Sequence, residues 1–316
     1  MPDNRCGRGQ RHRSRLAAGA LTIALATTGC SAVSSLAARQ APGGTASSAA
    51  ANGASGTSLA APGSAVPPNP AGPPKGPFAG TPADHWADGT AGIVTPKAEP
   101  IGGYTKAQVA DAYQTTKKLL VAAYLDKHTL LGGPPVVFED LLIAPQRTWF
   151  VRNLNKIGLD KDGSSLSSRE MVMAFAPGDA RLIGDVIKVR GTMSAKTAVR
   201  QGQEELDVQV DYLFAYAVEP PGRPAQWMRV VPEAVWTVGF GRWQGTSATF
   251  APWVQATGGG VSGAQCGTKD GYQHPAYQVP AITVPNPSDS PSGKPINPYA
   301  LNGARNGQAC QATTGT

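Results

Sequence analysis

The run from Leu206 to Val218 places an apolar side chain at every second position. In the first half of this run, the intervening positions are polar: Asp207, Gln209 and Asp211. Successive side chains of a strand point to opposite faces of a sheet, so a strict alternation is typical of a strand with one face on a core. The chain must therefore build a sheet in this region, with a second layer to cover its apolar face.

Three further segments predict strands. Residues 183–193 and 227–240 show the same alternation, and residues 171–176 predict a shorter strand. Pro232 interrupts the segment 227–240, which indicates a bulge or an edge position, because proline cannot donate a hydrogen bond to a neighbouring strand.

A helix is predicted before these strands. Thr105 and Gln108 have the spacing of a capping box, and Tyr104 and Val109 flank them as a hydrophobic staple. Apolar residues then recur at helical spacing as far as Tyr124. The Gly-Gly-Pro-Pro sequence at 132–135 is expected to end the helix.

Shorter helices are expected over residues 136–143 and after Pro145. Helices followed by a run of strands predict the α+β class, here a long N-terminal helix and shorter ones packed on a bent antiparallel sheet of about four strands. A turn near residues 200–202 would place Arg190 opposite Asp211, where opposite charges favour one register. This order of elements resembles the nuclear transport factor 2-like fold, and a cystatin-like sheet would give much the same order.

Composition divides the chain into four parts. In residues 41–80, 34 of 40 positions are Ala, Gly, Ser, Thr or Pro, and such a segment cannot bury enough apolar surface to fold. Residues 30–100 are therefore expected to be a disordered tether. Residues 101–265 have the size of one domain, and residues 266–316 form a tail rich in Pro and Gly.

The first residues have the pattern of an export signal. Five arginines and one aspartate precede an apolar or small stretch at residues 16–29. This stretch is shorter than the roughly 18 apolar residues of a membrane-spanning helix. Removal of residues 1–29 would lower the net charge from +7 to +3, which gives little support to nucleic-acid binding, and no nucleic-acid partner is expected.

The six residues that end at Cys30, LATTGC, resemble the lipobox of bacterial lipoproteins, although Thr27 stands where leucine is preferred. The resemblance implies that Cys30 becomes the mature N-terminus and carries a covalent diacylglycerol, with no other cofactor expected. Cleavage after Ala26 would instead give a free secreted protein, and a third alternative is that Cys30 is a buried structural residue.

Cys266 and Cys310 are the cysteines that remain beyond Cys30. In an oxidising compartment two cysteines favour one disulfide, which would secure the tail. Two unrelated free thiols are the alternative.

Motifs for catalysis, metals and phosphate are missing from the sequence. It contains no HExxH, CxxC, GxSxG or SxxK motif in a usable context, and no metal site or catalytic residue is assigned. The closest cluster of polar candidates brackets the turn at residues 132–135: Asp126, His128, Glu139 and Asp140. Residues 160–163 resemble part of a calcium loop but lack the acidic twelfth position. Charged helix ends and a simple turn explain both patterns better.

Aromatic residues suggest where a ligand could bind. Trp227, Trp236, Trp243 and Trp253 are close in sequence, and exposed members would suit a protein or carbohydrate partner. If the sheet enclosed a pocket, the predicted lining residues would be Tyr212, Phe214, Tyr216 and Trp236.

These observations together predict a lipid-anchored envelope protein. Its domain would bind or scaffold without catalysis, with membrane lipid held through Cys30 and an envelope protein as its partner. Two alternatives remain at this point: a small-ligand carrier with an apolar pocket, and a secreted enzyme of the nuclear transport factor 2-like type with an acid or base in its pocket.

Overall fold

The computed structural model describes residues 76–161, 165–200, 202–265, 268–277 and 297–301. The expected signal peptide, Cys30, Cys266 and Cys310 all lie outside these residues. Among the helices that the described part contains, none is both long enough and apolar enough to cross a membrane.

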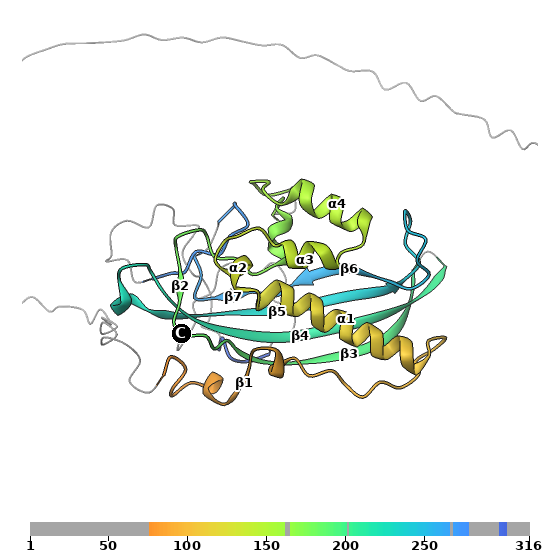
Figure 1. Ribbon diagram of the computed structural model, residues 1–316, viewed down its shortest axis with the longest axis horizontal. Helices are drawn as coiled ribbons and strands as arrows, with labels where there is room; N and C mark the ends of the chain where they lie inside the picture. The colour runs from red at the N-terminus through yellow and green to blue at the C-terminus, as the bar shows by residue number, and fades with distance from the viewer. Residues whose placement is uncertain (1–75, 162–164, 201, 266–267, 278–296, 302–316) are drawn as a thin grey trace, which may run out of the picture. The chain divides into compact units, whose positions relative to one another are not determined.

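The described strands form one antiparallel sheet, with the class α+β as predicted (Figure 1). Its four long strands pair in sequence order: β3 (Lys188–Arg200), β4 (Gln203–Glu219), β5 (Met228–Gly241) and β6 (Ala251–Gly258). Strands β3, β4 and β5 correspond to three of the predicted segments, whereas β6 was not predicted. Three two-residue strands extend the sheet further: β1 (Ala87–Asp88) on β3, β2 (Arg181–Leu182) on β4, and β7 (Val261–Ser262) on β5. Strands of two residues are too short to carry a periodic signal in the sequence.

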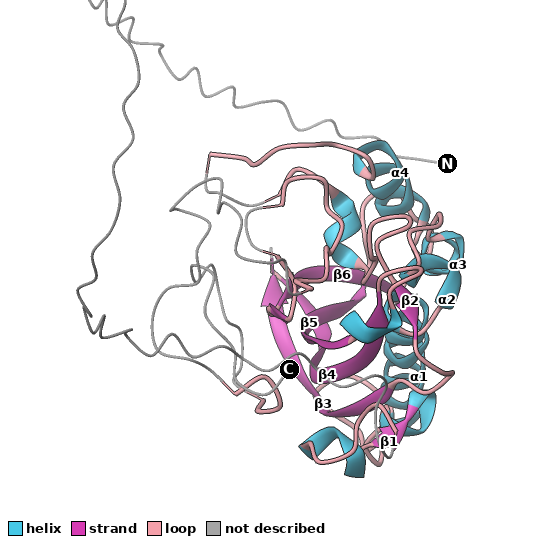
Figure 2. Ribbon diagram, turned by 90° about the vertical axis from the view of Figure 1, so that its left-hand side faces the viewer, coloured by secondary structure: helices cyan, strands magenta, loops and turns pink. Residues whose placement is uncertain are grey.

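The helices precede the long strands and lie on the concave face of the sheet (Figure 2). They are α1 (Lys106–Tyr124), α2 (Lys127–Leu130), α3 (Val136–Leu141) and α4 (Ala144–Asn153). The capping box of α1 is formed as predicted, with Thr105 accepting from the Gln108 backbone and Gln108 bonding the Thr105 backbone in return. The helix ends at Tyr124, earlier than expected, because the Asp126 side chain caps α2 by accepting from the Thr129 N–H.

Short 3-10 turns complete the described elements: η1 (Pro82–His85), η2 (Gly89–Gly92), η3 (Ser168–Met171) and η4 (Pro224–Gln226). The strand predicted over residues 171–176 is not formed. Its residues lie instead as an extended connection that bonds to neighbouring segments one residue at a time, through Met173 N–H to Ala123 and Phe175 N–H to Leu130.

Both faces of the sheet are covered, but by different parts of the chain. The even-numbered residues of β4 from Leu206 to Val218 face the helices. The opposite face carries a second apolar cluster: Phe78, Ala83, Trp86, Leu213, Ala215, Ala217, Val231 and Tyr299.

The second apolar cluster shows that the folded region begins earlier in the sequence than predicted. Residues 76–100, which composition assigns to the tether, contribute η1, β1 and η2 and bury Phe78 and Trp86. The Arg229 Nε also donates to the Pro77 carbonyl at 2.6 Å. Folded structure therefore begins by Gly76 and not at Ile101. The composition misled because only a few aromatic residues anchor an otherwise Gly- and Pro-rich segment.

The register of β3 and β4 differs from the prediction by two residues. Arg190 lies opposite Leu213, and Asp211 lies opposite Thr192. The hairpin turn lies one residue later than that pairing requires: Arg200 pairs directly with Gln203, whereas the predicted register would place residue 199 opposite residue 202. A shift of two residues keeps every side chain on its predicted face.

Pro232 marks neither a bulge nor an edge. It lies within β5, opposite Val261 of β7. The bulge of β5 and β6 occurs further along, where Thr237 pairs with Ala256 and Val238 pairs with Val254.

Candidate binding cleft at the hairpin end of the sheet

The four residues predicted to line a pocket belong to the packed core. Tyr212, Phe214, Tyr216 and Trp236 are each at most 1% exposed. Tyr124 of α1 fills the space above them, stacked on Phe214 with ring centroids 4.5 Å apart and 5.6 Å from Trp236.

The two tyrosine hydroxyls of this set bond backbone carbonyls. Tyr216 Oη donates to the Tyr124 carbonyl at 2.8 Å, and Tyr212 Oη donates to the Val94 carbonyl at 3.0 Å. Burial raises the pKa of Tyr212 to about 12, with the bond to Val94 opposing the rise. These hydroxyls stay protonated at neutral pH and satisfy the interior, as buried polar groups must.

A cleft of about 550 Å³ lies elsewhere, at the end of the sheet where the β3–β4 and β5–β6 hairpins turn. Its lining comes from these two hairpins: Arg200, Gln203, Glu205, Arg242, Trp243, Gln244, Gly245, Thr246 and Trp253. The odd-numbered residues of β4 point away from α1, so Glu205 faces the side of the sheet opposite the helices.

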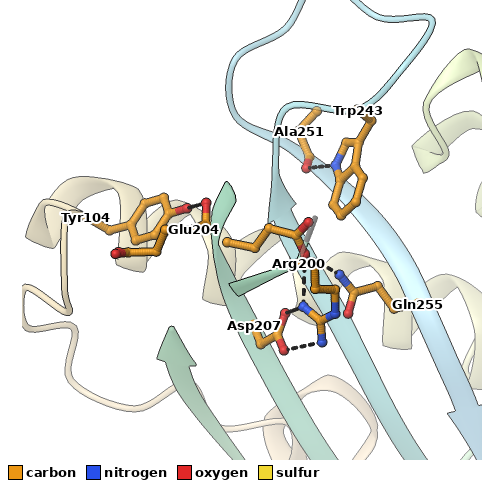
Figure 3. Close-up of polar contacts among 8 residues, drawn as sticks. Tyr104, Arg200, Glu204, Asp207, Trp243, Ala251 and Gln255 are labelled. Atoms are coloured by element: carbon orange, nitrogen blue, oxygen red, sulfur yellow. Dashed lines mark hydrogen bonds and ion pairs between the residues drawn. The ribbon is translucent and has the colours of Figure 1, made fainter. Parts of the chain in front are cut away.

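An ion network forms the floor of this cleft (Figure 3). Arg200 binds Asp207 with two parallel hydrogen bonds, Nη1 to Oδ1 at 2.8 Å and Nη2 to Oδ2 at 2.7 Å. Its Nη1 also donates to Glu205 Oε2 at 2.9 Å, and Gln255 Nε2 donates to the same oxygen at 2.8 Å. The hydrogen bonds with Asp207 raise the pKa of Arg200 above its ordinary value, so the guanidinium remains charged.

Two tryptophans form the wall of the cleft. Trp243 and Trp253 lie with ring centroids 5.5 Å apart and planes inclined by 40°. Trp243 Nε1 donates to the Ala251 carbonyl at 2.7 Å, which fixes the indole across its own hairpin (Figure 3). Gly239 provides room beneath them, because a Cβ there would lie 2.0 Å from the Gln255 amide and 3.3 Å from the Trp243 ring.

The hairpin end is anchored on its other side as well. Tyr104 Oη donates to the Glu204 carbonyl at 2.7 Å, and the Gly103 N–H donates to Glu204 Oε1 at 3.0 Å. Phe250 of the β5–β6 loop packs on Tyr104 and on Phe240, with centroids 5.7 Å and 5.4 Å apart. Both hairpins that line the cleft are therefore held by contacts with residues 103–104 and with the helix-side core.

A second, more apolar cleft of about 340 Å³ adjoins the first along β6. Its lining residues are Gln146, Trp149, Met171, Trp253, Val254, Gln255 and Thr257, so Trp253 belongs to both clefts. Gln146 of α4 binds the edge strand like a short strand of its own: its Nε2 donates to the Val254 carbonyl at 2.8 Å, and its Oε1 accepts from the Val254 N–H at 3.1 Å.

The other polar candidates from the sequence are not assembled into a site. Within the described ranges, no group of three or more His, Cys, Asp or Glu side chains could hold a metal ion. Asp126 serves as a helix cap, and the loop at residues 160–163 lies partly outside the described part.

One histidine cluster lies in a region that the sequence does not single out. His274 Nδ1 lies 2.6 Å from Asp179 Oδ2, and its Nε2 lies 3.0 Å from Asp270 Oδ2. Burial alone would lower the pKa of His274, but the hydrogen bonds with Asp270 and Asp179 outweigh it, and the pKa is raised. Both ring nitrogens thus face carboxylates, and the cluster fastens residues 268–277 to the loop at Asp179.

The sequence identified the tryptophans but not their polar neighbours. Trp243 and Trp253 belong to the region in which the sequence is dense in tryptophan, whereas no binding role was predicted for Arg200, Glu205 or Gln255. The available signal was Glu205 two residues before Asp207, two acidic side chains on one face of a strand, which require a cation between them. Comparison with protein-family models, with curated proteins and with solved structures finds no match to this chain.

Proposed function

We propose that this chain is a lipid-anchored protein of the cell envelope whose folded domain binds a ligand without catalysis in the Trp243–Trp253 cleft. The observation that carries the proposal is the pairing of charges in the cleft. Arg200 is bound to Asp207 and Glu205, and Gln255 completes the network.

Such a network suits recognition better than catalysis. A catalytic acid or base must gain and lose a proton within reach of its substrate. Here the carboxylates of Asp207 and Glu205 are 2% and 10% exposed and bonded to a cation that stays protonated. Groups fixed in this way can orient a ligand by hydrogen bonds while the tryptophans supply apolar contact area.

The anchor remains an inference from the sequence. Cys30 would carry the diacylglycerol, and residues 31–75 would join it to the folded region. If these residues behave as a coil, as their composition predicts, their root-mean-square span is about 37 Å. That distance allows the cleft to reach material beyond the lipid headgroups, including an envelope protein partner.

The binding role can be tested by sedimentation with isolated cell envelopes. The full chain carrying Cys30→Ala removes any contribution from lipid. We expect saturable co-sedimentation, at least tenfold weaker for a second chain that also carries Trp253→Ala, as for a buried aromatic contact. Val199→Ala, an exposed position on the helix-side face of the neighbouring β3–β4 hairpin, is the control and should bind normally.

Thermal unfolding of each variant checks that the fold is intact. Absence of co-sedimentation, or equal binding by the Trp253→Ala chain, contradicts a ligand in this cleft.

A further inference from the structure

We infer that the ligand of the proposed binding site is a carbohydrate chain that extends across both clefts. The inference rests on the proposed function and adds the chemical class and the extent of the ligand. It starts from the shared wall: Trp253 lines the larger cleft beside Trp243 and the smaller cleft beside Trp149. Gln255 lines the smaller cleft and bonds Glu205 in the larger one.

The two clefts together form a continuous track, and its side chains match the two kinds of surface on a sugar ring. A pyranose has an apolar face of C–H groups and a rim of hydroxyls. Indole rings offer flat apolar faces with weak C–H contacts, and Trp149 is 45% exposed. Guanidinium, amide and carboxylate groups donate to or accept from hydroxyls, and Arg242, Gln203 and Glu205 provide all three.

The charge of the track disfavours nucleic acid. Arg200 and Arg242 are balanced by Glu205 and Asp207, so the cleft carries no excess of positive charge. Phosphate backbones are bound mainly through unbalanced Lys and Arg side chains. Within the described residues, Arg242 is the one arginine of the cleft that forms no ion pair, and a single such arginine is few for binding a phosphate backbone.

The edge of the sheet disfavours a peptide added as an extra strand. On β6, Pro252 has no N–H, and both backbone groups of Val254 are already bonded to Gln146. Residues two apart on a strand present their backbone groups to the same side, so an added strand would find no N–H at residue 252 and no free backbone group at Val254. This part of the edge is therefore poorly suited to pairing with a peptide backbone.

The experiment compares treated envelopes. Envelopes are divided into untreated, protease-digested, and periodate-oxidised samples, because periodate cleaves the vicinal diols of sugars. We expect the Cys30→Ala chain to bind protease-digested envelopes as well as untreated ones and to lose at least tenfold in affinity for oxidised ones.

The outcomes separate the two proposals. Binding that is lost to protease but survives periodate overturns the carbohydrate inference while the binding function stands. Absence of binding to untreated envelopes refutes the proposed function itself.

The extent of the ligand is tested with two variants and soluble glycan fragments of graded length released from the same envelopes. Trp253→Ala should weaken every fragment, by about 30-fold for a central tryptophan. Trp149→Ala should weaken only long fragments and leave the shortest binding fragment unchanged. Equal effects of Trp149→Ala on all lengths, or none on any, would contradict a chain that spans both clefts.

Discussion

At the scale of single residues, the cleft depends on Arg200. The side chains of Asp207 and Glu205 are only 2% and 10% exposed, and the two carboxylates lie on the same face of β4. Two buried anions so close together repel one another, and each has lost hydration. Arg200 offsets both costs with one planar group, which a lysine could not do with the same geometry. The residue therefore contributes to stability and to the shape of the site.

Replacement of Arg200 by alanine should destabilise the fold. The variant leaves two buried carboxylates without their cation, and we expect a loss of about 2 kcal/mol in the free energy of unfolding at pH 7, below the roughly 3–5 kcal/mol of fully buried pairs because Arg200 is partly exposed.

Urea unfolding at pH 7 measures this effect. Arg190→Ala, an exposed arginine on the same strand, is the control and should change the free energy by less than about 0.5 kcal/mol. Similar losses for both arginines would show that the ion network contributes nothing specific.

At the scale of elements, local signals predicted well and long-range ones less so. The capping box of α1 needs only residues three apart in sequence, and it formed as predicted. The pairing of β3 with β4 depends on the turn, and an error in the turn moved the register by two residues. The role of Gln146 has no sequence signal at all, because it depends on β6 lying beside α4 in space.

The connection at residues 268–277 should be held more weakly as the pH rises. The pKa of His274 is raised in the folded state, so its contribution is complete below the ordinary histidine value near 6.5 and is lost as the pH passes through the raised value. We expect hydrogen exchange in this connection, corrected for the intrinsic rate, to be faster at pH 8.5 than at pH 6.

A His274→Asn chain should lose this dependence and resemble the native chain at pH 8.5. Equal protection of the native chain at both pH values would mean that the two carboxylates do not hold a protonated ring.

At the scale of the whole molecule, the chain covers its sheet from both ends of the sequence. Residues 76–93 and 297–301 contribute Phe78, Trp86 and Tyr299 to the face opposite the helices, while α1 covers the concave face. Sequence periodicity predicted the helix side, where long elements meet, and missed the other, where isolated aromatics dock from segments rich in Gly and Pro. The predicted pocket proved to be a filled core, because periodicity identifies apolar residues but does not tell whether they enclose a space.

The anchor is tested on the whole chain in cells. Metabolic labelling with a fatty acid should mark the native chain and not Cys30→Ala. We also expect the native chain to require detergent for release from the membrane fraction, whereas the variant, held by the cleft alone, should be released without detergent. Label on both chains would contradict the assignment to Cys30, and label on neither would favour cleavage after Ala26.

The hydrogen bonds of Gln146 to β6 protect the edge of the sheet from pairing with a second copy of the chain. If the chain is anchored as proposed, copies on one membrane meet at high local concentration and in similar orientations, the conditions under which exposed strands associate into fibres. With Pro252 and the bonded Val254 at the edge of β6, neighbouring copies find few free backbone groups there. The same glutamine that shapes the smaller cleft would thereby let the protein crowd without polymerising.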